Sequence, residues 1–180
     1  AKIPVGTNFY DYSFVTNECE QSLVRFGVTA VNETGEGSVG YTPYMVVGKP
    51  YDTPFFESFQ GAELTYDMWW TLKKDFTIGL TLDSSDGDGG SFAMRSDAND
   101  GTGIIGSGKI CLAGTTNPLL LFRHLPDARS HAPLVVSLPK PPVSIYDLSP
   151  IAFSAAAAGW VPESISLHSA LSSSPYVIFI

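Results

Sequence analysis

Three aspartates in one glycine-rich stretch are the residues of this chain best suited to chemistry. Asp83, Asp86 and Asp88 fall within six positions and are interleaved with glycines. Carboxylates spaced in this way can surround a hard cation such as Ca²⁺, and their mutual repulsion is unfavourable without one. An EF-hand is excluded, because placing Asp86 and Asp88 at its third and fifth ligand positions puts Arg95 where that loop requires a glutamate. The sequence therefore predicts a calcium site of another type, with a solvated acidic turn as the alternative.

A second candidate site consists of aromatic residues. Trp69 and Trp70, with Tyr66 and Tyr51 near them in sequence, could form a stacking platform for a sugar ring. Adjacent residues on a strand point to opposite faces, so at most one of the two tryptophans would face a ligand. The alternative, which we favour, is that both indoles pack in the core.

Residues for catalysis or zinc binding are present, but their spacing matches no known site. His124, His131 and His168 fit neither a structural nor a catalytic zinc pattern, and we expect surface or strand histidines. The nucleophile motif Gly-x-Ser-x-Gly is absent, and its nearest look-alike, Gly106-Ser-Gly108, falls at the start of an expected strand. We therefore expect a protein that is not an enzyme.

Charge and cysteine content narrow the possible partners and compartments. Ten basic against eighteen acidic residues give a net charge of −8, which disfavours nucleic acids and anionic membrane surfaces as partners. No apolar run approaches the roughly 18 residues of a membrane span, and the start at Ala1 shows no signal-peptide core. A bond between Cys19 and Cys111 would imply an oxidising compartment. Because the two cysteines fall in different expected units, we favour two separate thiols.

The elements that must position these residues are short strands. The 17 glycines and 13 prolines are scattered through a chain that is 44% hydrophobic, as is typical of strands joined by turns. No segment keeps a helical period, and the best helix candidate, 152–158, is short and ends at Gly159. The sequence therefore predicts an all-β fold. Expected strands are 23–31, 39–47, 76–82, 104–112, 119–124, 134–138, 164–167 and 176–180.

The first expected strand pair is the most distinctive. Val24, Phe26, Val28 and Ala30 alternate with other residues, which predicts a strand with one buried face. Residues 32–37 tolerate positive φ and predict a turn before the second strand. Such a strand-turn-strand unit carries no nucleophile or ligand set, and it favours adhesion or binding.

Residues 1–48 resemble the C-terminal half of a fibronectin type III domain. The matching pieces are Thr7-Asn-Phe-Tyr-Asp11, which is similar to the strand end and turn before that domain's penultimate strand, and Phe26-Gly-Val-Thr-Ala-Val-Asn32 followed by Gly35-Glu-Gly37. A boundary is expected near Gly48-Lys-Pro50, where the composition changes.

Residues 49–180 resemble the MAM-like and cleaved-adhesin modules of bacterial surface proteins. The matching pieces are Phe55-Phe-Glu57, Leu82 to Gly90, Ser107 to Leu112 with Asn117 to Phe122, and Trp160 to Leu167 with Tyr176 to Ile180. The resemblance implies a concanavalin A-like jelly roll of two antiparallel sheets, used for adhesion and often stabilised by calcium. It also implies Glu57 as a distant calcium ligand.

Both resemblances are incomplete. The first half of the fibronectin-like unit and the closing strand of the jelly roll have no counterpart in these 180 residues. Half a sandwich exposes sheet edges and an open core. The sequence is therefore expected to be a fragment of a longer chain or, as the alternative, a subunit whose neighbours complete its sheets.

These observations favour a non-catalytic adhesion module at the cell surface or outside the cell, binding host protein or glycan and carrying a structural calcium ion. One alternative is a subunit of a surface fibre, assembled by pairing of the edges at 9–14 and 176–180. Another is a carbohydrate-binding module of a secreted hydrolase.

Overall fold

The structure is a computed structural model of the chain. It describes residues 2–4, 6–7, 9–13, 20–64, 68–74, 77–82, 91–95, 103–125, 135–138, 151–153, 159–171 and 176–179.

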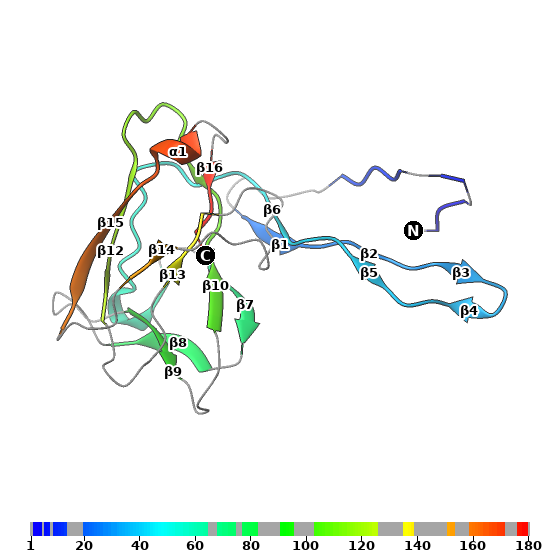
Figure 1. Ribbon diagram of the computed structural model, residues 1–180, viewed down its shortest axis with the longest axis horizontal. Coiled ribbons are helices and arrows are strands. Elements are labelled where there is room, and N and C mark those ends of the chain that lie inside the picture. Colours follow the sequence, from blue (N-terminus) through cyan, green and yellow to red (C-terminus); the bar gives the residue numbers. More distant parts are fainter. Residues whose placement is uncertain are drawn as a thin grey trace.

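The described residues form an all-β protein, as the sequence predicts. Strands make up nearly all of its regular structure, and the only helices among the described residues are two short ones (Figure 1). The elements are β1 (Ser22–Val24), β2 (Gly27–Val28), β3 (Val31–Asn32), β4 (Gly35–Glu36), β5 (Gly40–Tyr41), β6 (Met45–Val47), η1 (Gln60–Ala62), β7 (Trp70–Lys74), β8 (Thr77–Thr81), β9 (Ser91–Arg95), β10 (Gly103–Gly106), β11 (Ile110–Cys111), β12 (Leu119–His124), β13 (Val135–Val136), β14 (Ile151–Ala152), β15 (Val161–Ser166), α1 (His168–Leu171) and β16 (Tyr176–Val177).

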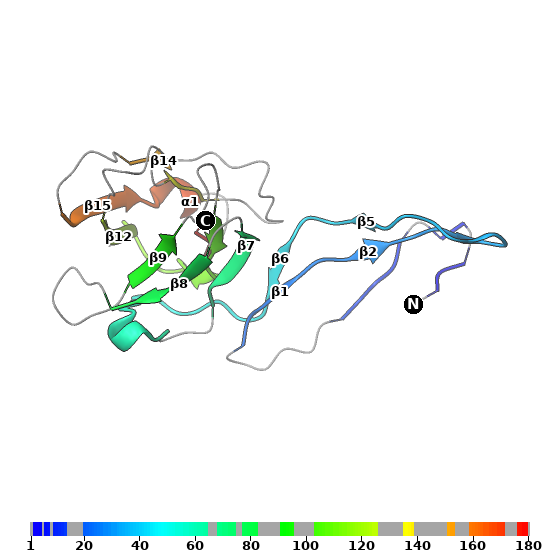
Figure 2. The same ribbon diagram turned by 90° about the horizontal axis from the view of Figure 1, so that it is seen from below.

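The first six strands form one long antiparallel ribbon, residues 22–47, which we call the arm. β1 pairs with β6, β2 with β5 and β3 with β4. Figures 1 and 2 show the arm projecting from the remainder of the chain, which we call the body. The two expected strands and their antiparallel pairing are therefore confirmed.

The tip of the arm is a two-residue turn, Glu33–Thr34, inside the expected turn region. The Asn32 Oδ1 atom accepts hydrogen bonds from the Thr34 N–H at 2.9 Å and from the Thr34 hydroxyl at 2.6 Å. Gly35 then adopts a φ of 129°, which residues other than glycine rarely adopt. Local chemistry thus fixes where the chain reverses.

The second strand of the arm contains one extra residue at each of two places. Residues 25–26 lie opposite 42–44, and residues 29–30 lie opposite 37–39, because the pairing register shifts by one residue between β1–β6 and β2–β5 and again between β2–β5 and β3–β4. At the first place Thr42 pairs with Phe26, donating its N–H to the Phe26 carbonyl and accepting the Phe26 N–H on Oγ1. Such bulges bend a ribbon and increase its twist.

Burial along the arm differs from the expected half-buried strand. Val24 and Phe26 are half-buried, but Val28 is 66% exposed and Ala30 is exposed. Tyr12 from the N-terminal segment contacts Phe26 edge-on, with ring centroids 5.8 Å apart. Burial of the apolar face therefore stops near the base of the arm among the described residues.

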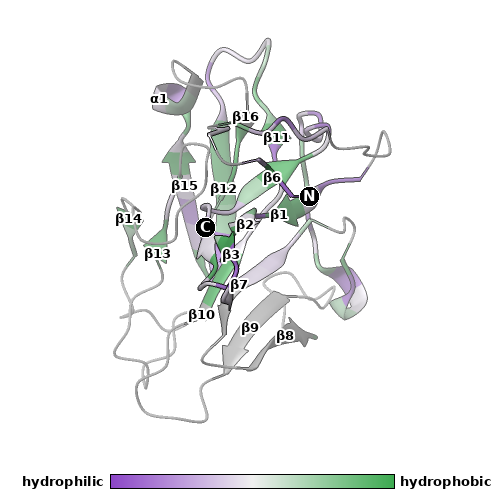
Figure 3. Ribbon diagram, turned by 90° about the vertical axis from the view of Figure 1, so that its right-hand side faces the viewer, coloured by the Kyte–Doolittle hydropathy of each residue, from purple (hydrophilic) through white to green (hydrophobic). Residues whose placement is uncertain are grey.

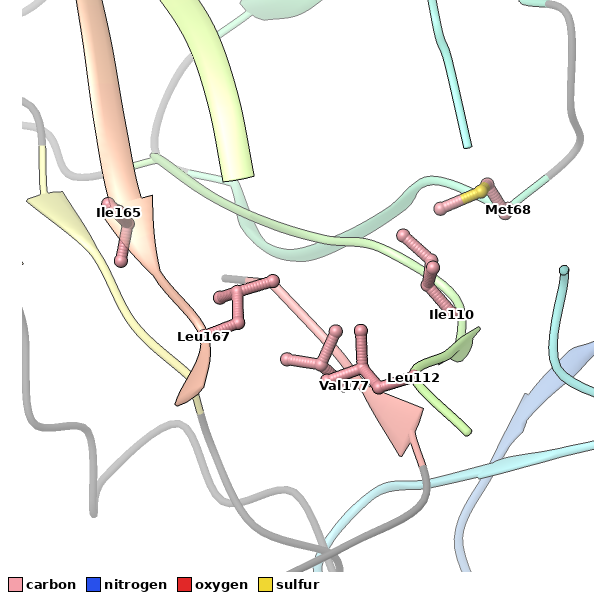
Figure 4. Packing of buried hydrophobic residues seen from close by; sticks show 6 residues of the cluster. All are labelled: Met68, Ile110, Leu112, Ile165, Leu167 and Val177. Carbon is pink, nitrogen blue, oxygen red and sulfur yellow. The ribbon is translucent and has the colours of Figure 1, made fainter. Parts of the chain in front are cut away.

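The body contains the remaining two-stranded antiparallel sheets. β12 pairs with β15 along its whole length, β7 with β10, β8 with β9, β11 with β16, and β13 with β14. Figure 3 shows hydrophobic residues concentrated on β10 and β12, whereas much of β15 is hydrophilic. The buried core lies between these sheets (Figure 4), and its central cluster is Met68, Ile110, Leu112, Ile165, Leu167 and Val177.

The segment after α1 returns into the body. β16 pairs with β11, and Val177 and Ile178 are 4% and 3% exposed. Phe179, which follows Ile178, is held by Ser107. The Ser107 N–H donates to the Phe179 carbonyl, and the Ser107 Oγ accepts the Phe179 N–H, both at 2.9 Å. One edge of the expected strand 176–180 is thus occupied within the chain, which differs from the open apolar edge that the sequence suggested.

The arm is joined to the body through Gln21, whose side chain is buried. Its Nε2 donates to the Lys109 carbonyl at 2.9 Å, and its Oε1 accepts the Lys109 N–H at 2.7 Å. Tyr51 also donates its N–H to the Lys109 carbonyl, and its own carbonyl accepts the Cys111 N–H. Both ends of the arm are therefore bound to the same stretch of the body. Gly48 completes the joint, since a Cβ there would collide with the Glu20 carbonyl oxygen.

The helix expected at 152–158 is not present at its first residue, because Ala152 belongs to β14. Residues 154–158 lie outside the described residues. The four-residue helix α1 occurs at a place where the sequence predicted none.

Candidate functional site

The three aspartates of the expected calcium site, Asp83, Asp86 and Asp88, lie outside the residues that the structure describes. Glu57 is described and half-buried, and its Oε1 accepts the Phe59 N–H at 3.1 Å. Among the described residues, no group of three His, Cys, Asp or Glu side chains gathers as metal ligands would. The calcium site, with Glu57 as a ligand, stays a prediction.

The two tryptophans lie at the edge of the core. Trp69 is half-buried against the central hydrophobic cluster, with its ring centroid 5.8 Å from that of Phe59. Trp70 begins β7, is half-buried and pairs with Gly106. Tyr66 lies outside the described residues. The packing of Trp69 resembles the core arrangement that we favoured, and the sugar platform stays a prediction.

Of the three histidines, two are described and they lie in different surroundings. His124 on β12 lies beside Glu163 on β15, with Nε2 and Oε1 3.2 Å apart and the two side chains 10% and 24% exposed. The rings of Phe122 and Phe153 flank it, with centroids 6.3 Å and 6.0 Å from that of the imidazole. His168 is exposed at the start of α1, and His131 lies outside the described residues. Among the described residues, His124 and Glu163 are joined by no third side chain that would complete a metal ligand set.

Lys109 and Cys111 lie where the arm meets the body. Cys111 is half-buried and carries a free thiol, and Cys19 lies outside the described residues. Burial lowers the pKa of Lys109 from its ordinary value of 10.5, because a low-dielectric environment disfavours the charged ammonium.

The arm presents several exposed apolar side chains. Exposed fractions are 66% for Val28, 62% for Val31, 44% for Val39 and 59% for Tyr41. In the neighbouring N-terminal segment, Phe9, Tyr10 and Tyr12 are also more than half exposed.

A cationic side chain is fixed among aromatic rings on the same arm. The guanidinium carbon of Arg25 lies 4.1 Å from the ring centroid of Tyr41 and 5.0 Å from that of Tyr44. Tyr41 in turn lies across Gly27, where a Cβ would come within 3.0 Å of the tyrosine ring and within 2.9 Å of Val39. Gly27 is therefore required for this packing, since a side chain there would displace the tyrosine ring or Val39.

This cluster was missed by sequence reasoning. Arg25 is 16 positions before Tyr41 in the chain, and the bulge that brings both tyrosines to it depends on the pairing register. A sequence signal does exist in Tyr41-Thr-Pro-Tyr44, because proline in a strand indicates a bulge or an edge.

Within the described ranges, the structure contains no helix with the length and apolar character needed to span a bilayer. Comparison of the chain with protein-family models, with curated proteins and with solved structures found no match.

Proposed function

We propose that the chain is a non-catalytic adhesion or binding module that presents its arm to a partner. The observation that carries this proposal is the projection of the arm from the body, with apolar and aromatic side chains exposed along it. Isolated exposed apolar residues are normal on protein surfaces, but larger groups of them mark interaction sites.

In this proposal the body holds the arm, and the arm presents the binding residues. The body buries a hydrophobic core and holds the base of the arm through the Gln21–Lys109 hydrogen bonds. The tip is fixed by the Asn32–Thr34 bonds. A hairpin that is joined to the body at its base and has a hydrogen-bonded turn keeps its exposed side chains in a more defined geometry than a free loop, which lowers the entropic cost of binding a partner.

The domain assignments belong to the same proposal. Residues 1–48 form the end of a fibronectin type III-like unit, and residues 49–180 form a MAM-like jelly roll with a structural calcium ion at Asp83, Asp86, Asp88 and Glu57. The antiparallel pairing of residues 22–32 with 35–47 supports the first assignment, because the quoted fibronectin-like motif occupies these strands. Adhesion to host protein or glycan places the module at the cell surface or outside the cell.

A binding comparison between two apolar double variants tests the proposal. Full-length protein is applied to immobilised host extracellular-matrix proteins and to a glycan array. The variant Val28→Ser with Val31→Ser should lose binding, because it removes the most exposed apolar side chains of the arm. The variant Leu119→Ser with Leu121→Ser removes leucines that are 56% and 68% exposed on β12 of the body, and it should bind as the wild type does. Equal binding by both variants, or no binding by the wild type, would overturn the proposal.

A second candidate is a structural subunit that assembles by strand pairing. Each sheet among the described residues contains only two strands, so no third described strand continues the sheets of the arm on either side. An unpaired edge is a template for a strand from another chain. Light scattering after size-exclusion chromatography decides this candidate: a monomer at micromolar concentration contradicts it, and a concentration-dependent oligomer supports it.

A further inference from the structure

We propose that Arg25, Tyr41 and Tyr44 form a binding site for a carboxylated sugar, such as a uronic or sialic acid residue of a glycan. The inference rests on the proposed binding function and names a ligand class for it. It concerns the Arg25 side of the arm, and the apolar residues on which the adhesion test depends are different ones.

The arginine is held in a geometry suited to a carboxylate. Its guanidinium carbon lies 4.1 Å and 5.0 Å from the two ring centroids, so the flat cation lies over the tyrosine rings. A guanidinium group has a planar fork of N–H groups that can make two parallel hydrogen bonds to a carboxylate. Arg25 and Tyr41 are both exposed, and a ligand can reach them.

The backbone is shaped to create this cluster. Residues 41 and 44 are three positions apart, and in a regular strand they would point to opposite faces. The extra residue at 42–44, opposite 25–26, changes that parity, and both rings lie against Arg25. Gly27 provides the space into which Tyr41 packs. Bulges often direct side chains toward functional sites.

Among the residues that the structure describes, no carboxylate neutralises the charge of Arg25. In the part of the chain that the structure describes, no carboxylate lies within ion-pair distance of Arg25. The whole chain carries eighteen acidic and ten basic residues, so an arginine with no acidic neighbour among the described residues is notable. An anionic group from a ligand would complete the site.

The rest of the surface determines which anion fits. The proposed site contains one cation, Arg25, and the chain as a whole has a net charge of −8. This favours a ligand with one isolated carboxylate, because the net negative charge repels polyanions such as nucleic acids or acidic peptides. Tyr41 is 59% exposed beside the guanidinium, so the C–H face of a sugar ring can lie on the phenol. Phe26 follows Arg25 directly in the strand and points to the other face. A partner that covers Phe26 and Val28 therefore leaves the proposed site open.

The test is a titration of the full-length protein with three matched probes. These are a glucuronic acid-terminated trisaccharide, the methyl ester of the same sugar, and a short glutamate peptide, each followed by the NMR signals of the tyrosine rings. We expect the acid to bind with a dissociation constant on the order of 1 mM. The ester and the peptide should bind at least about tenfold more weakly, because the ester lacks the charge and the peptide lacks the sugar ring.

Two variants and a control locate the binding. Arg25→Lys keeps the charge but loses the planar fork, and it should weaken binding of the acid about tenfold. Tyr41→Ala should have a similar effect. Arg123→Gln removes an exposed arginine from β12 of the body and should leave binding unchanged. Thermal unfolding of each variant confirms that it is folded.

Other outcomes overturn the inference. Equal binding of acid and ester excludes a carboxylate site, equal binding of the peptide excludes a sugar site, and unchanged binding by Arg25→Lys excludes this location. If these results fail while the Val28→Ser, Val31→Ser variant still loses adhesion, the proposed function stands and only the acidic-sugar site is rejected.

Discussion

The side-chain amide of Gln21 pairs with the backbone of Lys109 as a neighbouring strand would, donating to its carbonyl at 2.9 Å and accepting its N–H at 2.7 Å. These residues are 88 positions apart in sequence. The contact leaves little space around it, since a Cβ on Gly108 would lie 2.9 Å from the Gln21 Oε1 atom and 3.1 Å from the Met68 Cβ. The buried Gln21 side chain therefore joins the arm to the body together with the backbone hydrogen bonds of Tyr51.

Replacing Gln21 with alanine should destabilise the protein by about 1–3 kcal/mol, because the Lys109 N–H loses its partner in a partly buried place. Gln21→Glu should also destabilise, since a carboxylate cannot donate to the Lys109 carbonyl. Urea unfolding measures both changes, and hydrogen exchange at the Lys109 amide should become faster. Gln60→Ala, at an exposed glutamine, should change stability by less than about 0.5 kcal/mol. Equal effects at Gln21 and Gln60 would contradict the role of Gln21.

Leu112→Ala should lower the free energy of unfolding by about 2–5 kcal/mol. The Leu112 side chain is 2% exposed at the centre of the core, and its truncation leaves a cavity. Leu121→Ala is the matched control, since Leu121 is 68% exposed on β12 and should change stability by less than about 0.5 kcal/mol. Thermal and urea unfolding check both. A small effect at Leu112 would mean that the cluster does not stabilise the body.

The lowered pKa of Lys109 predicts a dependence of stability on pH. Burial disfavours the ammonium in the folded state, so the unfolded chain binds this proton more tightly than the folded chain does. The resulting cost is present in full below the folded pKa and is relieved as the pH rises through it toward 10.5. The contribution of Lys109 to stability therefore increases with pH in that window.

Lys109→Met removes this contribution. The free energy of unfolding of the variant should rise less steeply than that of the wild type as the pH increases toward 10.5. Lys49→Met, at an exposed lysine, should leave the slope as it is. Parallel curves for the wild type and Lys109→Met would show that burial of this amine has no measurable effect.

The calcium proposal is tested at the aspartates. Asp86→Asn with Asp88→Asn should lower the melting temperature in calcium and abolish the difference between calcium and chelator, because amides replace charged ligands. Asp52→Asn, at an exposed aspartate, should keep the calcium response. An identical wild-type melting curve with and without chelator would remove the site from the proposal.

Local patterns in the sequence predicted the strands whose signals are local. The expected strand at 119–124 has the limits of β12, and the arm turns where Asn32 and Gly35 favour it. The strands β4, β7, β9 and β14 were not expected, and β4 falls in the region predicted as a turn. The sequence Trp70-Thr-Leu-Lys-Lys74 shows why: its alternation is weak, and pairing with β10 is a contact distant in sequence.

The candidate site was harder to predict than the fold. Tyr41 and Tyr44 both lie near Arg25 because the strand that carries them contains one extra residue. Hydrophobic periodicity carries no information about that shift in register. Exposure of Val28 was also unexpected, because an alternating pattern indicates which face is apolar but not whether anything covers it. The aspartate site remains a prediction from residue type and spacing.

The two bulges make the long sides of the arm unequal. Both extra residues are in the strand formed by 35–47, so a straight strand laid along that side would fall out of step twice, whereas the side formed by 22–32 has no such interruption. A strand from another chain would therefore meet no interruption only along the side formed by 22–32. Two copies that pair along the side formed by 22–32 are related by a twofold axis, and each uses its edge to pair with the other. No equivalent edge then remains for a third copy, so association by this route ends at a dimer.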